Sequence, residues 1–198
     1  ININRAKKGL NKANSIWFWG AGTKPSLDSF EEKYGKKGTM ISAVDLLKGI
    51  AVGAGMNIVE VEGATGSIDT NYEGKANAAL KALLEEDQDF VYIHIEAPDE
   101  MGHQGSIKDK VKAIELIDEK VVKVLLKELR ESNVQFKMLI MPDHPTPIKY
   151  RTHTSNPVPY LIYDSENQLN NTWNYNEKEA KDSGNFVDEG YILMNKFL

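Results

Sequence analysis

Short apolar runs typical of β-strands alternate along the chain with segments of helical periodicity, and this alternation limits the fold more than any other feature. The strand-like runs lie at residues 15–19, 39–42, 56–61, 89–95, 135–141 and 160–163. Helical spacing of apolar residues is found at 43–54, 72–86, 106–132 and 186–198. Such an order predicts an α/β fold of three layers, with a mostly parallel sheet and helices on both faces.

Composition excludes several classes of protein. The chain of 198 residues is 41% hydrophobic and 27% charged, which is ordinary for one soluble domain. The net charge of −5, with no basic stripe, argues against binding of nucleic acid. No apolar stretch is long enough to span a membrane. Cysteine is absent, which excludes disulfides and thiolate ligands and fits a reducing compartment, so we expect a cytoplasmic location without membrane partners.

The amino-terminal segment differs from the rest. Residues 1–14 are polar and basic and are interpreted as a linker or helix that leads from an upstream segment. Residues 15–198 carry the strand and helix pattern of the domain itself. The first residue is Ile1 rather than Met, which suggests a fragment, a processed product or missing upstream sequence.

Metal-ligating side chains follow two of the expected strands. Asp99 and His103 come just after the strand at 89–95, and Asp143-His144 directly follow the strand at 135–141. His153 lies nine residues later, between two threonines. Open α/β sheets place their chemistry beyond the carboxyl ends of the strands. Carboxylate and imidazole are both good ligands for divalent metals, so these five residues predict a dinuclear site, with solvated turn residues as the alternative.

Two metals suit phosphoryl transfer for a physical reason. A pair of divalent ions about 4 Å apart can hold both the attacking and the leaving oxygen. Mixed Asp and His ligands admit Mn, Zn, Co or Fe. The imidazoles need acceptors for their second N–H, and Glu96 and Glu100 are candidates. His94 lies inside a strand and is interpreted as a core residue, and the apolar stripe of 107–125 as core packing.

Five motifs carry a resemblance to a known family: IHIEAPDEMGHQG (93–105), MPDHPTP (141–147), RTHTSNPVP (151–159), WFWGAGTKPSL (17–27) and EGATGSIDT (62–70). With them the chain closely resembles the alkaline-phosphatase superfamily and, within it, the cofactor-independent phosphoglycerate mutases of archaeal type. That branch also occurs in bacteria, where some members are described as homoserine kinases. The resemblance covers almost the whole chain and implies an alkaline-phosphatase-like fold, here incomplete.

The resemblance assigns roles to individual residues. Asp99, His103 and His153 would hold one metal, and Asp143 and His144 the other. It favours manganese, with zinc or cobalt also compatible, and no organic cofactor. In the family a serine takes the phosphoryl group from one hydroxyl of glycerate and returns it to the neighbouring one. Lys48 and Arg151 would contact the small phosphorylated substrate. For Lys48 the alternative is that its side chain simply lies on a solvated helix face.

One departure from the family pattern limits what this chain can do. The nucleophilic serine and a further metal-binding Asp lie upstream of the WGxG segment in the family and are followed by a cap domain. This chain begins just before WFWGAG, so the resemblance implies a missing amino-terminal half and cap domain, and negligible turnover without them. Alternatives are a related phosphotransferase that acts on homoserine, or a metal-binding module without catalysis.

Overall fold

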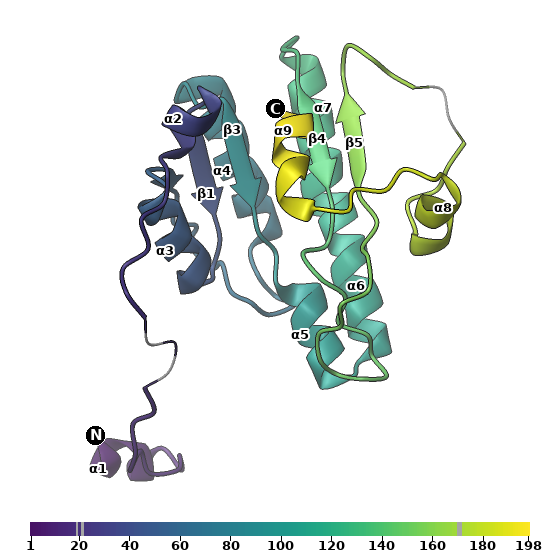
Figure 1. Cartoon of the computed structure of the whole chain (residues 1–198). Helices are drawn as coiled ribbons and strands as arrows, with labels where there is room; N and C mark the ends of the chain where they lie inside the picture. The colour runs from purple at the N-terminus through teal and green to yellow at the C-terminus, as the bar shows by residue number, and fades with distance from the viewer. Residues whose placement is uncertain (19, 21, 170–171) are drawn as a thin grey trace.

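The computed structural model describes residues 1–18, 20, 22–169 and 172–198, and it contains two small sheets (Figure 1). The first is parallel with the order β2-β1-β3. In the second, β4 and β5 pair antiparallel. Figure 1 shows that β4 nevertheless runs in the same direction as β1 and β3, so these three strands end at the same end of the molecule. The strands are β1 (Gly38–Ile41), β2 (Asn57–Ile58), β3 (Phe90–Ile93), β4 (Lys137–Ile140) and β5 (Leu161–Asp164).

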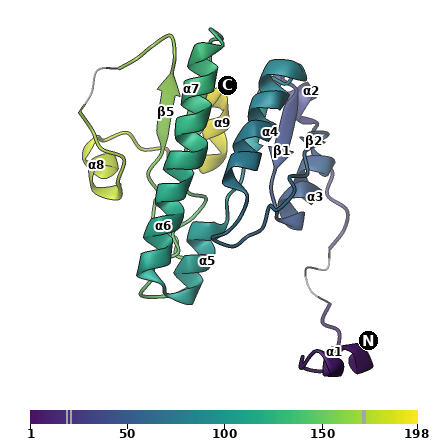
Figure 2. The same cartoon turned by 180° about the vertical axis from the view of Figure 1, so that it is seen from behind.

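Helices lie on both sides of these strands. In Figures 1 and 2, α4 and α7 lie behind the strands of Figure 1, whereas α9 lies in front of β4. Phe197 of α9 contacts Phe90 of β3, with ring centroids 6.4 Å apart. The helices are α1 (Asn2–Lys7), α2 (Phe30–Tyr34), α3 (Asp45–Gly53), α4 (Tyr72–Glu85), α5 (Ala97–Gln104), α6 (Ile107–Ile117), the π-helix η1 (Asp118–Val122), α7 (Lys123–Glu131), α8 (Glu177–Asp182), the 3₁₀-helix η2 (Gly190–Ile192) and α9 (Leu193–Phe197).

The core lies between the parallel sheet and the helices behind it. Ala76, Ala79 and Ala82 of α4 are fully buried, and such small side chains let this helix approach β1 and β3 closely. Val121 and Leu125 cover the same core from η1 and α7. The expected α/β architecture with helices on both faces is therefore confirmed. The candidate ligands are expected at the edge of the sheet where the carboxyl ends of its strands lie.

Three local expectations need correction. The segment expected to be helical at 186–198 is helical only from residue 190, as η2 and α9. The apolar run at 15–19 forms no strand over residues 15–18, which are exposed coil; residue 19 lies outside the described residues. The long helix at 106–132 is present as α6, η1 and α7, but Ile107, Val111 and Ile114 are 68%, 51% and 53% exposed. They are not core because α6 runs beyond the sheet and packs mainly on α5. The interpretation of the whole stripe as core was wrong for this half.

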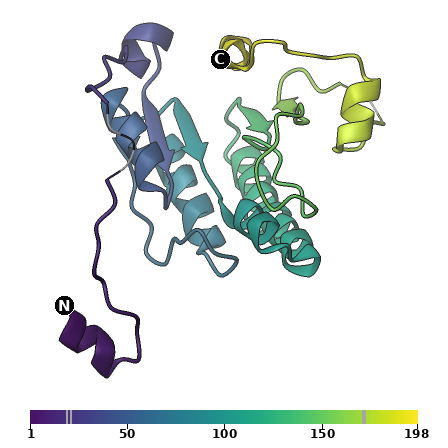
Figure 3. The same cartoon turned by 60° about the horizontal axis from the view of Figure 1, so that its bottom comes forward.

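The amino-terminal helix stands apart from the other elements in Figure 3, where the end of the molecule at which β1 and β3 terminate comes forward. That residues 1–14 connect the domain to an upstream segment of the protein remains a prediction. Among the described residues, no helix combines the length and the apolar character that a membrane crossing would need.

Candidate metal centre

Asp99 and His103 lie on the short helix α5, which follows the strand that the sequence predicted and was not itself expected. Pro98 and the acidic residues of its first turn favour a helix start there, and Gly105 ends the helix with φ of 73°. Residues four apart share one helix face. The Nε2 atom of His103 consequently lies 3.3 Å from Oδ2 of Asp99.

The chain after β4 folds back onto α5 and adds the other ligands. Gly102 permits this docking, because a Cβ atom there would lie only 2.6 Å from the carbonyl oxygen of Thr146. Lys110 of α6 donates to the same carbonyl at 2.6 Å. The amide of Thr154 donates to the carbonyl of Pro145 at 3.1 Å, which holds the segment of His153 against that of His144.

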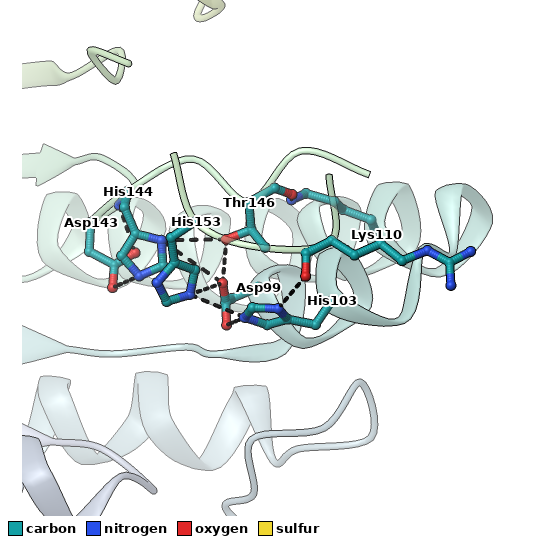
Figure 4. Close-up of polar contacts among 8 residues, drawn as sticks. Asp99, His103, Lys110, Asp143, His144, Thr146 and His153 are labelled. Atoms are coloured by element: carbon teal, nitrogen blue, oxygen red, sulfur yellow. Dashed lines mark hydrogen bonds and ion pairs between the residues drawn. The ribbon is translucent and has the colours of Figure 1, made fainter. Parts of the chain in front are cut away.

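All five candidate ligands meet in one cluster around Asp99 (Figure 4). Oδ1 of Asp99 lies 3.2 Å from Nε2 of His153 and 3.9 Å from Nδ1 of His144. The Nε2 atoms of His103 and His153 are 3.1 Å apart. Asp143 joins at the edge, with Oδ2 3.3 Å from Nε2 of His144. One ligand atom each from Asp99, His144 and His153 lie within 4.8 Å of one another, as a shared metal ion requires.

The two ligand groups that the resemblance implied lie next to each other in this cluster. Nδ1 of His144, which was expected to serve the second metal with Asp143, lies 3.9 Å from Oδ1 of Asp99, which was expected to serve the first. His103 also contacts both Asp99 and His153. Asp99 thus lies between all three imidazoles, and the five side chains form a single donor set of two carboxylates and three imidazoles. That set fits a first-row divalent metal.

The orientation of His103 is fixed by a backbone group. Its Nδ1 lies 3.0 Å from the carbonyl oxygen of Arg151. Because a carbonyl only accepts hydrogen bonds, Nδ1 carries the proton and Nε2 is left to bind a cation. The expected acceptors Glu96 and Glu100 do not fill this role. Arg151 has the positive φ of 54°, unusual outside glycine, that turns its carbonyl into place.

The buried layer beside the cluster is also polar. His94 lies 3.4 Å from the Ser42 hydroxyl through Nδ1, and burial lowers the pKa of His94, in line with its interpretation as a core residue. The buried Lys75 of α4 donates to the His94 carbonyl at 3.0 Å, and burial lowers the pKa of Lys75. Burial and then the carboxylates of Glu100 and Asp99 raise the pKa of Glu96. The carboxylates of Glu96, Glu100 and Asp99 thus lie near enough to one another for their charges to interact.

The two candidate substrate residues lie outside the cluster of ligands. Nζ of Lys48 is 2.9 Å from Glu60 and 3.8 Å from Asp45. The guanidinium of Arg151 packs over Gly105, where a Cβ atom would lie 2.5 Å from its Nε atom. Only the backbone of Arg151 contacts a ligand. Sequence reasoning missed Thr146, Lys110 and Gly102, although Thr146 stands two residues from His144 and Gly102 beside His103.

A family model described as the Metalloenzyme superfamily matches residues 4–197 of this chain. The chain belongs to this superfamily, and membership implies that it binds divalent metal. Among curated relatives, a protein of Methanosarcina acetivorans is 52% identical over 166 residues, which cover 84% of this chain and 41% of the relative. One of Methanothrix thermoacetophila is 48% identical over 194 residues, covering 98% and 49%. Both are named 2,3-bisphosphoglycerate-independent phosphoglycerate mutase, which confirms the resemblance.

Solved structures agree on the fold. A protein of Pyrococcus horikoshii superposes with a TM-score of 0.69 at 32% identity, over 78% of this chain and 46% of that one. A cofactor-independent phosphoglycerate mutase of Thermoplasma acidophilum gives a TM-score of 0.62 over 99% of this chain and 45% of its own. At 23% identity the second match supports the fold alone. The chain spans less than half the length of the relatives it matches.

Proposed function

We propose that this chain is the metal-binding part, with residues 15–198 as its domain, of a phosphoglycerate mutase that interconverts 3-phosphoglycerate and 2-phosphoglycerate through a phosphoserine. The observation that carries this proposal is the convergence of Asp99, His103, Asp143, His144 and His153 in one donor set. It is supported by the names of relatives about half identical to the chain.

Two divalent ions, most favourably manganese and alternatively zinc or cobalt, would supply the charge that activates a serine and holds the phosphate oxygens. In this assignment Asp99, His103 and His153 hold one ion, and Asp143 and His144 the other. The carboxylate of Asp99 lies close to the imidazoles of both ligand groups, so we propose that Asp99 lies between the two ions. The donor set contains no thiolate, which suits manganese as well as zinc.

Lys48 and Arg151 are proposed to contact the phosphate of the small substrate. For Arg151 this requires its exposed side chain to leave Gly105, and for Lys48 it requires exchange of Glu60 for the phosphate. Both contacts are ion pairs or packing at the surface, which cost little to rearrange.

The remaining parts are proposed to come from a different segment of the same protein. The relatives are about twice as long as this chain, which supports a further half with the nucleophilic serine, another Asp and a cap domain. The 198 residues alone are then expected to have negligible turnover. The absence of cysteine further supports a cytoplasmic site of action.

The test uses the chain together with whatever sequence precedes Ile1 in its gene. Purified protein loaded with Mn²⁺ should interconvert the two phosphoglycerates, and a chelator should abolish the activity until Mn²⁺ is restored. Phosphate transfer to homoserine is assayed in parallel. Metal-loaded protein that transfers phosphate to homoserine but lacks mutase activity would replace this assignment with the alternative one, and metal-loaded protein with neither activity would leave only a metal-binding role.

A further inference from the structure

We propose that the hydroxyl of Thr146 is a positioning group that joins the two halves of the metal centre, and this inference rests on the proposed metal site. Thr146 is 4% exposed, and Figure 4 shows its hydroxyl beside both Asp99 and His144. Its Oγ1 atom donates a hydrogen bond to Oδ1 of Asp99 and lies 3.4 Å from Nδ1 of His144.

The direction of these hydrogen bonds follows from the chemistry of the groups. An ionised carboxylate only accepts, so the single proton of the hydroxyl must point to Asp99. Toward His144 the hydroxyl can then only accept. With its Nε2 given to a metal, His144 would carry its ring proton on Nδ1 and would donate it to the hydroxyl of Thr146. Thr146 thereby orients the carboxylate of one ligand and the imidazole of another.

The hydroxyl can do this because its backbone cannot move freely. The carbonyl of Thr146 accepts from Lys110 at 2.6 Å, and it lies so close to Gly102 that any side chain there would touch it. The residue is thus held by α5 and α6, while His144 and Asp143 precede it in the same loop. A group that orients a metal ligand in this way commonly contributes a factor of about 10 to 100 to metal affinity.

The experiment compares three substitutions in the full protein, with Mn²⁺ titrated by calorimetry. Thr146→Val keeps the shape but removes the hydroxyl, and should weaken Mn²⁺ binding about 10- to 100-fold. Thr146→Ser keeps the hydroxyl and should bind within a few-fold of the parent. Thr39→Val is the matched control: Thr39 is equally buried, and its hydroxyl donates to Gln88 at 3.0 Å rather than to one of the five ligands, so the loss should leave affinity unchanged.

A second measurement keeps the inference testable if Thr146→Val fails to fold. Nitrogen NMR of the parent protein loaded with diamagnetic Zn²⁺ should show His144 protonated at Nδ1, and Thr146→Ser should keep that state. His144 protonated at Nε2 in the Zn²⁺-loaded parent, or parent-like Mn²⁺ affinity in a folded Thr146→Val protein, would overturn the inference. An equal loss of affinity in Thr39→Val would do the same. Parent protein that binds no divalent metal would instead refute the proposed metal site.

Discussion

Gly102 offers the most direct test of how the loop after β4 is docked on α5. In Gly102→Ala, the new Cβ atom would start 2.6 Å from the Thr146 carbonyl oxygen, 2.9 Å from its Cγ2 and 3.0 Å from Nζ of Lys110. Ordinary contacts of this kind begin at 3.4 Å, so the carbonyl must retreat by about 0.8 Å. The blocking atom belongs to the backbone, and the loop that carries His144 must therefore shift.

The magnitude follows from two opposing effects. Alanine in place of glycine inside a helix gains about 1 kcal/mol in helix propensity. Overpacking a close contact costs about 1–3 kcal/mol. The net free energy of unfolding should thus fall by about 0–2 kcal/mol. Metal affinity should fall by at least about 10-fold, because a displacement approaching 1 Å loosens the site's ligands.

Gly49 supplies a matched control within the same chain. It lies inside helix α3, and a Cβ atom there would meet nothing within 4 Å among the described residues. Gly49→Ala should therefore stabilise the protein by about 1 kcal/mol and leave metal binding unchanged. Since the propensity gain is common to both variants, their difference of about 1–3 kcal/mol isolates the contact with Thr146.

The assay is urea unfolding for stability and calorimetric Mn²⁺ titration for affinity, with circular dichroism to confirm the fold of each variant. A folded Gly102→Ala protein as stable as Gly49→Ala, and with parent-like Mn²⁺ affinity, would show that the docking of the loop on α5 does not determine the metal centre.

Three further predictions follow from the same structure. Asp99→Ala should weaken Mn²⁺ binding strongly and His94→Ala much less in a calorimetric titration, because only Asp99 lies among the imidazoles of the cluster; equal losses would contradict the ligand assignment. Burial lowers the pKa of Lys75 below its ordinary value of 10.5, although the carboxylate of Glu96 acts in the opposite direction. Between the pKa of the folded state and 10.5 the unfolded state binds more protons, so the free energy of unfolding should rise as the pH approaches 10.5. Lys75→Met should flatten that rise in urea titrations across the alkaline range, and an unchanged slope would refute the cause. Arg151→Gly should bind Mn²⁺ like the parent, since only the carbonyl contacts His103 and glycine favours the positive φ; a large loss would assign the metal effect to the guanidinium.

The sequence was most informative about the ligands and the order of the elements. Asp99, His103, Asp143 and His144 could be named because they follow apolar strand-like runs and are residue types that bind metals. His153 lies farther along the chain, in a motif that carries the family resemblance. The parallel sheet and the long helix at 106–132 follow from periodicity that is governed by local backbone geometry. These features depend on neighbours within a few residues, and a single sequence records them.

Features that depend on contacts across the fold were less predictable. Helix α5 was not predicted, although Pro98 and Gly105 are signals of a helix start and a helix end. The exposed face of α6 looks like a core stripe in sequence, and only its position beyond the sheet shows otherwise. The partners of His103 and of Asp99, a carbonyl and a hydroxyl about 50 residues away in sequence, leave no periodic trace.

The grouping of the ligands likewise required coordinates. Sequence order and family resemblance separate His144 from Asp99, whereas the structure places Nδ1 of His144 3.9 Å from the Asp99 carboxylate. Residues brought together by a loop that folds back on a helix have a geometry set by Gly102 and Lys110, which carry no ligand atoms themselves.

Anomalous diffraction at the manganese edge, from crystals of the protein grown with Mn²⁺, tests the central claim most directly. The account predicts an anomalous peak within about 2.0–2.3 Å of ligand atoms from both Asp99 and His153. Manganese bound only at other carboxylates, with His103 and His153 still hydrogen-bonded to each other, would contradict it.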